Sequence, residues 1–364
     1  MHVLICGGGA IGTSIAYFLG RRGVGATVIE GTGIACAASG KSGGFLARDW
    51  CDGSPLAPLA RRSFDLHAEL AEAVDGDWGY RRLDTYGGFA GYPRRPGAYD
   101  LAWMADEVTV AQALGTPETT AQVHPGEFTA GMMHAAEAAG ATLRIGRVDG
   151  IARRGDRAIG VEVDGAAIEG DAVVVAMGPW SILAATWLPL PPVFGLKGHS
   201  LVFDTESQIP PEAAFLEYRE PGSGAVLTPE LVPRSDGTTY VCGISGEEVL
   251  PVDPARVRPD GGALYRLEAM CRAISPVLAG APIVARQACY RPVTRDGLPL
   301  IGAVPGVAGA YVATGHSVWG ILNAPATGEA MAELIVDGKA RTVDLAPFAP
   351  GRLPALDPAR LRVG

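Results

Sequence analysis

Lysine is scarce in this chain of 364 residues, where it occurs only at Lys41, Lys197 and Lys339. A reaction step that needs an ammonium group therefore has three candidates. The formal net charge is −9, and the arginines are scattered among acidic residues. A nucleic-acid backbone needs a concentrated cationic surface, so we expect no nucleic-acid partner.

Cysteines and long hydrophobic runs are also limited. The six cysteines show no C-x-x-C spacing and no neighbouring histidines, which argues against a zinc site or a disulfide framework. No apolar stretch reaches the length of a membrane span without glycine, proline or charge, and glycines interrupt the N-terminal run where a signal peptide would be continuous. We expect a reduced, cytoplasmic protein with no metal and no membrane association.

Glycine, by contrast, is abundant. The 50 glycines are about one residue in seven, roughly twice the usual share. They follow no G-x-y period, so they are expected to serve tight turns and close backbone approach. Such a composition suggests a nucleotide cofactor.

The N-terminus has the pattern of a β-α-β unit. A short apolar run at 2–6 predicts a buried strand, the spacing over 11–22 predicts a helix, and 26–29 predicts a second strand. Between strand and helix lies a G-x-G-x-x-G sequence, and its expected cofactor contacts are Gly7, Gly9, Ala10, Ile11 and Gly12.

Each glycine of this motif has a distinct expected role in a Rossmann-type fold. Gly7 permits the turn, Gly9 lets a pyrophosphate approach the backbone, and Gly12 lets helix and strand pack closely. The helix N-terminus attracts phosphate. Glu30 follows the second strand, where its carboxylate can accept ribose hydroxyls and disfavours a 2′-phosphate. FAD and NAD share this motif, so both remain open on it alone.

The remaining pattern predicts an α/β protein whose chain leaves the nucleotide domain and returns to it. Helices are expected at 55–74, 99–114, 125–139, 262–274 and 320–336, and strands at 83–90, 142–148, 158–163, 172–176, 200–203, 239–242 and 310–314. We predict a discontinuous FAD-binding domain over 1–75, 124–190 and 283–345, a substrate domain over 76–123 and 191–282, and a C-terminal tail at 346–364.

Several further segments carry a family resemblance. They are ASGKSGG at 38–44, AMGPWS at 176–181, RPVTRDGLPLIG at 291–302, and the segments 315–317 and 320–328. With the N-terminal unit, they make the chain resemble the D-amino-acid oxidase family of FAD-dependent oxidoreductases, which includes glycine oxidase and sarcosine oxidase. The match spans nearly the whole chain and is poor around 76–120 and 205–280.

The resemblance implies a fold, a cofactor and a reaction. The fold is a Rossmann-type FAD-binding domain with a second, antiparallel-sheet substrate domain, and the cofactor is FAD. The reaction is oxidation of a C–N bond of an amino acid or secondary amine to an imine, by hydride transfer to flavin N5. The expected partner is therefore a small amino acid or amine.

The resemblance also implies a set of FAD contacts. The loop at 39–44 would bind the phosphates and ribityl chain, with Lys41 pairing with a phosphate, and a second helix N-terminus near Gly320 would lie at the flavin pyrimidine edge. From the residues alone, these segments could equally be a surface loop, a helix cap or core positions without a cofactor. The residues implied are Ser39, Gly40, Lys41, Ser42, Gly43, Gly44, Val148 (ending a strand beside adenine), Ala176, Gly178, Trp180, Gly315, His316, Ser317, Trp319, Gly320 and Ile321.

Three further residues are candidates for the reacting site. By resemblance to glycine oxidase, Arg291 pairs with a substrate carboxylate, which suits guanidinium geometry; the alternative is a structural ion pair. Tyr290 and Lys197 are candidate partners in catalysis; Tyr240 is the alternative tyrosine, and Lys41 or an arginine is the alternative to Lys197 for oxygen activation.

Cys289 falls at the cysteine of the pattern C-x-x-x-x-T-x-D, which in sarcosine oxidase is linked covalently to flavin. Thr294 and Asp296 match the same pattern. A buried free thiol is the ordinary alternative. Covalent attachment at Cys289 is therefore a hypothesis alongside non-covalent binding.

Departures from the family patterns leave the acceptor open. Leu322 and Asn323 stand where sarcosine oxidase has a lysine, which speaks against sarcosine as substrate. No lysine occurs between Lys197 and Lys339, so an acceptor other than oxygen fits too. The alternatives are an FAD-dependent dehydrogenase and a flavin-binding, non-catalytic assembly or trafficking protein.

Overall fold

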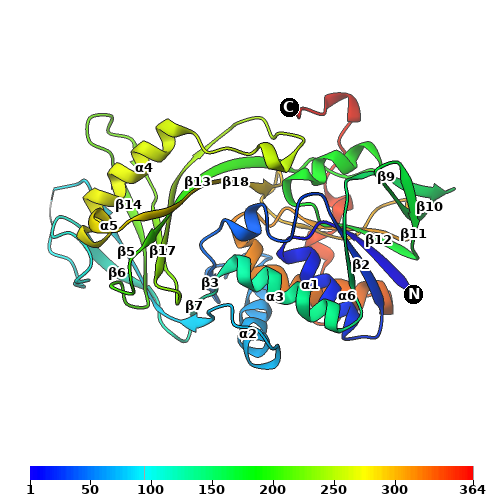
Figure 1. The fold of residues 1–364 in the computed structure, drawn as a ribbon, viewed down its shortest axis with the longest axis horizontal. Coiled ribbons are helices and arrows are strands. Elements are labelled where there is room, and N and C mark those ends of the chain that lie inside the picture. Colours follow the sequence, from blue (N-terminus) through cyan, green and yellow to red (C-terminus); the bar gives the residue numbers. More distant parts are fainter. Residues whose placement is uncertain (94, 364) are drawn as a thin grey trace.

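The computed structural model describes residues 1–93 and 95–363. Two large sheets organise them, one at each end of the elongated molecule in Figure 1, and the long strands β13 and β18 run between these ends. The mixed α/β architecture predicted from the sequence is confirmed.

The first sheet is six-stranded and contains the N-terminal unit. Its order is β19-β20-β12-β1-β2-β8, and every pairing is parallel except that of β19 with β20. Its strands are β1 (His2–Cys6), β2 (Gly25–Glu30), β8 (Thr142–Ile145), β12 (Ala172–Val175), β19 (Leu300–Ala303) and β20 (Ala310–Thr314).

The alternation of β1 explains how this sheet is covered on both faces. Val3 and Ile5 pack in one core with the helices α1 (Ala10–Gly20), α2 (Ala57–Ala73), α3 (Pro125–Ala138) and α6 (Gly320–Asp337). Leu4 and Cys6 point the other way, into a core shared with the three-stranded sheet of β9 (Val148–Arg154), β10 (Arg157–Val163) and β11 (Ala166–Glu169).

The second large sheet is eight-stranded and mainly antiparallel. Its order is β18-β13-β17-β16-β14-β5-β6, with β15 beside β14, and only β14 and β5 pair in parallel. The strands are β5 (Asp84–Ala90), β6 (Thr109–Gly115), β13 (Phe194–Asp204), β14 (Glu212–Arg219), β15 (Val226–Leu227), β16 (Glu230–Pro233), β17 (Thr238–Gly246) and β18 (Ile283–Val293).

One face of this sheet is covered by α4 (Gly261–Ile274) and α5 (Pro276–Gly280). Leu267 and Met270 of α4 pack with Leu201 and Val241 of the sheet. A small sheet of β3 (Phe45–Ala47), β7 (Thr120–Gln122) and β4 (Arg81–Arg82) completes the strands described. The opposite face of the eight-stranded sheet is thus free to line a site.

Two expectations about secondary structure are wrong. The helix expected at 99–114 is a loop followed by β6, because Trp103 is held by tertiary contacts: its indole N–H donates to Glu212 over 2.8 Å, and Ser275 Oγ donates to its carbonyl. Val148 begins β9 rather than ending a strand, since β8 stops at Ile145 and residues 146–147 belong to neither strand.

The pairing of β18 bears on the proposed domain division. Residues 283–293, which we assigned to the FAD-binding domain, pair with β13 in the eight-stranded sheet. The division itself stays a prediction, with this boundary placed closer to 293.

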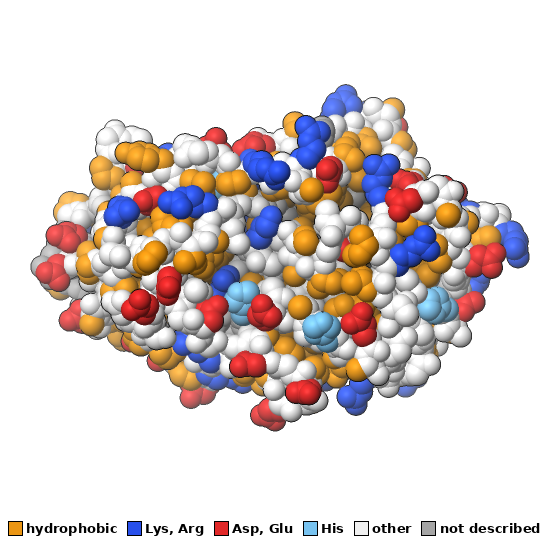
Figure 2. All heavy atoms as spheres, viewed as in Figure 1, with side chains coloured by type: hydrophobic (Ala, Val, Ile, Leu, Met, Phe, Trp, Pro, Cys, Tyr) orange, Lys and Arg blue, Asp and Glu red, His pale blue; other side chains and the backbone are white. Residues whose placement is uncertain are grey.

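Among the described residues, none of the helices has the length and hydropathy needed to cross a bilayer. Acidic and basic side chains are interspersed over the face drawn in Figure 2.

Candidate functional site

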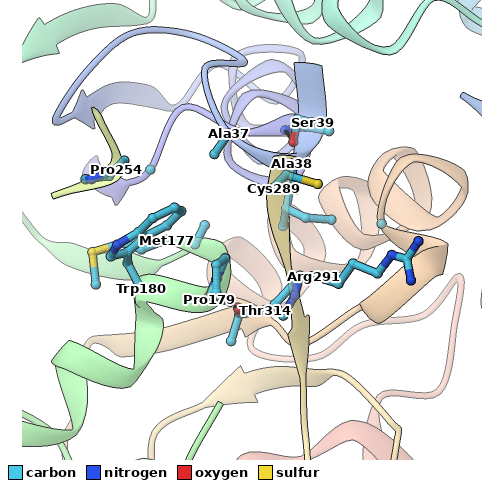
Figure 3. A pocket seen from close by; sticks show the side chains of 18 of the residues that line it. Ala37, Ala38, Ser39, Met177, Pro179, Trp180, Pro254, Cys289, Arg291 and Thr314 are labelled. Carbon is cyan, nitrogen blue, oxygen red and sulfur yellow. Dashed lines mark hydrogen bonds between the residues drawn. The ribbon is translucent and has the colours of Figure 1, made fainter. Parts of the chain in front are cut away.

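A cavity of about 800 Å³ lies between the two large sheets. One side is formed by the turn after β1, the loop at 35–44 and the start of α6. The other, here called the sheet side, consists of Gly198, Phe215, Glu230, Tyr240, Cys242, Cys289, Arg291 and Pro292. Figure 3 shows loop residues 37–39 near Cys289, with Trp180 across the cavity.

The glycines after β1 have separate physical roles. Gly7 has φ +116°, and a Cβ there would lie 2.4 Å from the Ala176 carbonyl oxygen. A Cβ on Gly12 would lie 2.0 Å from the Gly7 oxygen. At Gly9 it would meet only Ser39 Oγ, at 3.1 Å. Gly7 and Gly12 thus permit backbone packing, whereas Gly9 keeps space open at the cavity.

The N-terminus of α1 faces this space. Gly9, Ala10 and Ile11 line the cavity, and the Ala10 N–H donates to Ser39 Oγ over 3.0 Å. Glu30 lines it at the end of β2, where its carboxylate accepts from the Gly8 N–H at 2.7 Å. A helix N-terminus beside a fixed carboxylate suits a phosphate next to a ribose.

The loop expected to bind phosphate lies partly in the cavity. Ser39, Ser42, Gly43 and Gly44 line it, whereas Gly40 and Lys41 do not. Gly40 serves packing, because a Cβ there would lie 2.1 Å from the Ala35 oxygen. Arg234 fastens the loop to the second sheet, donating from Nη2 to the Ser42 carbonyl over 2.9 Å.

The second helix N-terminus is also at the cavity. The lining includes His316, Ser317, Trp319, Gly320 and Ile321 at the start of α6. Gly315 lies behind them with φ +80°, and a Cβ on it would lie 2.7 Å from Thr294.

His316 is fully enclosed beside this helix start. Its Nε2 lies 3.1 Å from Thr327 Oγ1, and burial lowers its pKa to about 3. The ring is therefore neutral at physiological pH, which leaves the dipole of α6 as the positive influence at this end.

Ala176, Gly178, Trp180 and Val148 complete the first side of the cavity. The Trp180 indole N–H donates to the Pro251 carbonyl over 2.8 Å, which holds the ring in place. Val148 lines the cavity from the start of β9, so its position fits the cofactor prediction although its place in the strand does not.

Alternation along β18 divides the predicted reacting residues between two faces. Cys289 and Arg291 line the cavity and extend from the strand in the same direction (Figure 3). Tyr290 faces the other way and donates to the Val249 carbonyl over 3.0 Å. Lys197 pairs with Tyr290 across the strands, lies outside the cavity lining and donates to Glu248 over 2.5 Å. Their positions do not support the catalytic roles predicted for Tyr290 and Lys197.

Arg291 reaches across the neighbouring strand. A Cβ built on Gly198 would lie 3.5 Å from Arg291 Cζ, so the guanidinium lies over that glycine. Its Nη1 donates to Ser245 Oγ over 3.2 Å, and Nη2 lies 3.9 Å from Cys242 Sγ. Among the described residues, no carboxylate comes within ion-pair distance of it. This arrangement leaves a half-buried cation at the cavity that is able to bind an anionic ligand.

Sequence reasoning missed the acidic residue of the sheet side. Glu230 lies directly opposite Phe215 on one neighbouring strand and Cys242 on the other. Burial raises its pKa, and the Arg291 charge offsets part of that rise. The local sequence pattern gives Glu230 no distinguishing signal, so only the strand register could have found it.

Aromatic side chains close the cavity beside Glu230. Phe45, Trp50 and Phe215 contact one another with ring centroids 4.8–5.0 Å apart. Trp50 and Trp319, two tryptophans that fit a pocket wall as well as a core, both line the cavity. Tyr240 is the tyrosine on the same face as Cys242, in place of Tyr290.

Cys289 lies where a covalent link to flavin was predicted, and the link stays a prediction. Burial raises the pKa of its thiol, while the charges of Arg291 and Lys41 offset part of the rise. A thiol held in this way is mostly protonated at neutral pH, and attack on a flavin requires the thiolate.

The groups that line the cavity suit a dinucleotide. Two helix N-termini, a carboxylate that accepts from backbone amides, and the open space at Gly9 occur along a single cavity of about 800 Å³. A family model described as FAD-dependent oxidoreductase (DAO) matches residues 2–334.

The chain belongs to the DAO family of FAD-dependent oxidoreductases. FAD is accordingly its cofactor, as the sequence predicted.

Members of the DAO family resemble this chain over almost its full length. A Schizosaccharomyces pombe protein, named only in general terms as an oxidoreductase, is 31% identical, with 94% of this chain and 96% of that protein covered. Glycine oxidase of Pseudomonas putida is 28% identical, with 97% and 99% covered. The crystal structure of glycine oxidase from Geobacillus kaustophilus superposes with a TM-score of 0.79 at 27% identity, covering 96% of this chain and 98% of that one.

Proposed function

We propose that this DAO-family protein oxidises the C–N bond of an amino acid or N-alkyl amino acid to an imine, which water then hydrolyses. One observation carries the proposal: the half-buried Arg291 guanidinium faces the cavity, and no carboxylate of the described residues lies within ion-pair distance of it. Its remaining N–H groups suit a substrate carboxylate. The resemblance to glycine oxidases supports the same substrate class.

The protein's own contribution is binding and orientation. FAD, when bound, supplies the redox chemistry by accepting a hydride at N5. Gly9, Ser39 and the α1 N-terminus would hold its phosphates, Glu30 its ribose, and the start of α6 its pyrimidine edge. Arg291 would fix the substrate carboxylate so that the α-carbon approaches the ring.

An acceptor other than oxygen is a second candidate, favoured by the position of Lys197. This lysine is ion-paired with Glu248 outside the cavity lining, and among the described residues no lysine lines the cavity. An amino-acid dehydrogenase that passes electrons to another carrier therefore fits the same site. Reduction by substrate without air, followed by slow reoxidation in air, would distinguish it from an oxidase.

The test compares Arg291→Met with Arg295→Met, an exposed arginine four residues along the chain. We expect Arg291→Met to raise the amino-acid concentration needed for half-maximal flavin reduction by ~10- to 1,000-fold, from the loss of charge-assisted hydrogen bonds of about 1.5–4 kcal/mol in total. Arg295→Met should behave as wild type. Equal concentration dependence in all three proteins would overturn the proposal, and failure of every amine to reduce the flavin would favour the non-catalytic alternative.

A further inference from the structure

The eight-stranded sheet presents a row of side chains across neighbouring strands on its cavity face. Phe215, Glu230 and Cys242 are direct cross-strand partners on β14, β16 and β17. Directly opposite residues on one face have Cβ atoms about 4.5–5.5 Å apart. The row continues to Arg291, whose guanidinium passes over Gly198 and comes within 3.9 Å of Cys242 Sγ.

A carboxyl group and a guanidinium therefore lie on either side of one thiol. They are the only charged side chains on the sheet side of the cavity as described, and the other members are Gly198, Phe215, Tyr240, Cys242, Cys289 and Pro292. Glu230 has no ion pair with any described lysine or arginine. A carboxylate in such surroundings is stabilised by a cation that arrives with the ligand.

We propose that Glu230 is the specificity residue that binds the amino group of the substrate, while Arg291 binds its carboxylate. The site then selects a compact zwitterion, an α-amino acid or its N-alkyl derivative, over a carboxylic acid of the same shape. This inference rests on the proposed function, because it takes Arg291 as the carboxylate contact.

The spacing of the two groups supports this reading. An amino acid carries its ammonium and carboxylate groups on the same α-carbon, and only the Cys242 side chain lies between Glu230 and the Arg291 guanidinium along the row. The aromatic cluster of Phe45, Trp50 and Phe215 adjoins Glu230 on the side away from Arg291. A group carried on the substrate nitrogen or α-carbon would contact these rings.

Glycine and propionate make a matched pair of probes. Both are achiral, have the same number of heavy atoms and carry a carboxylate, but only glycine carries an ammonium group. Binding to the holoenzyme is measured by calorimetry without air after chemical reduction of its flavin, since the reduced cofactor cannot oxidise glycine. The readout is thus affinity and not activity.

We expect the wild-type protein to bind glycine at least ~10-fold more tightly than propionate, the ratio given by one charge-assisted hydrogen bond. The isosteric Glu230→Gln should bring the two affinities within about 3-fold of each other, because it weakens the binding of glycine and leaves the binding of propionate unchanged or tighter. Glu230→Asp, which keeps the charge, should retain part of the preference. Glu247→Gln, at an exposed glutamate near the end of β17, should leave it unchanged.

The outcomes separate the two proposals. A glycine preference that survives Glu230→Gln, or a wild-type protein that prefers propionate, overturns the role of Glu230. Arg291→Met should weaken both ligands by a similar factor. If it changes neither affinity, the proposed function fails, whatever Glu230 does.

Discussion

Substituting single glycines of the first turn separates cofactor binding from packing. Gly9 has φ −81° and ψ 176°, which alanine adopts readily, and its Cβ would meet only Ser39 Oγ. We expect Gly9→Ala to lower the free energy of unfolding by about 1 kcal/mol, the usual difference between glycine and alanine at a helix N-cap. The new methyl group would occupy the space into which a phosphate must come.

The effect on FAD binding should be larger than the effect on folding. Displacing the phosphate by one methyl group removes one charge-assisted hydrogen bond of about 1.5–3 kcal/mol, so FAD should dissociate ~10- to 100-fold more readily. Gly12→Ala should act in the opposite way, because its Cβ would lie 2.0 Å from the Gly7 carbonyl oxygen. That clash should lower the free energy of unfolding by about 2–3 kcal/mol or more.

Flavin fluorescence on dilution of the holoprotein measures dissociation, and urea unfolding of the FAD-free protein measures stability. Gly261→Ala is the matched control, since a Cβ at Gly261 meets nothing within 4 Å and the residue lies at the start of α4 outside the cavity. A Gly9→Ala protein that holds FAD as tightly as wild type would refute the assignment of this turn to the phosphates.

Three other outcomes are expected. If the predicted covalent link forms, acid precipitation leaves yellow colour in the pellet of the wild-type protein but not in that of Cys289→Ala, whereas free FAD in the supernatant rejects the link. The covalent attachment of FAD to FAD-free protein should also become faster as the pH rises towards the raised pKa of the Cys289 thiol. Lys197→Met should leave the rate of flavin reoxidation in air within about 2-fold of wild type, because this lysine pairs with Glu248 outside the cavity, and a large loss would restore its proposed role in oxygen activation. Burial lowers the pKa of His67 to about 4 and of His316 to about 3, so the unfolded state binds protons before the folded state does as the pH falls below the usual value near 6.5. Each histidine should therefore lower the free energy of unfolding by about 2 kcal/mol between pH 7 and 5. Urea unfolding at both pH values should show a smaller loss of stability in His67→Gln than in wild type, and an equal loss would contradict the role of His67.

The parts of the fold that local pattern predicts are those in which a strand is buried on both faces or a helix begins and ends with clear signals. The β1-α1-β2 unit follows directly from its glycines and apolar spacing. The segment at 99–114 shows the limit of local pattern: Leu101 and Met104 are buried in a loop, where they pack in one core with residues of α4 and α5. Only tertiary contact decides such a case.

The site was predicted where it depends on backbone and missed where it depends on sheet register. Glycine turns and helix starts are visible in sequence, so most residues predicted for the cofactor side line the cavity, and their contact with FAD stays a prediction. Tyr290 was proposed for its closeness in sequence to Arg291, although neighbouring strand residues point to opposite faces. Glu230 could not be found without knowing that it lies opposite Phe215 and Cys242.

The most direct test of the central claim is the absorbance of the FAD-bound protein as single amino acids and N-alkyl amino acids are added without air. We expect at least one of them to bleach the oxidised flavin with a saturable concentration dependence, and the 2-hydroxy acid of the same carbon skeleton to leave it oxidised. An unbleached flavin with every amino acid and amine, or bleaching by the hydroxy acid alone, would contradict it.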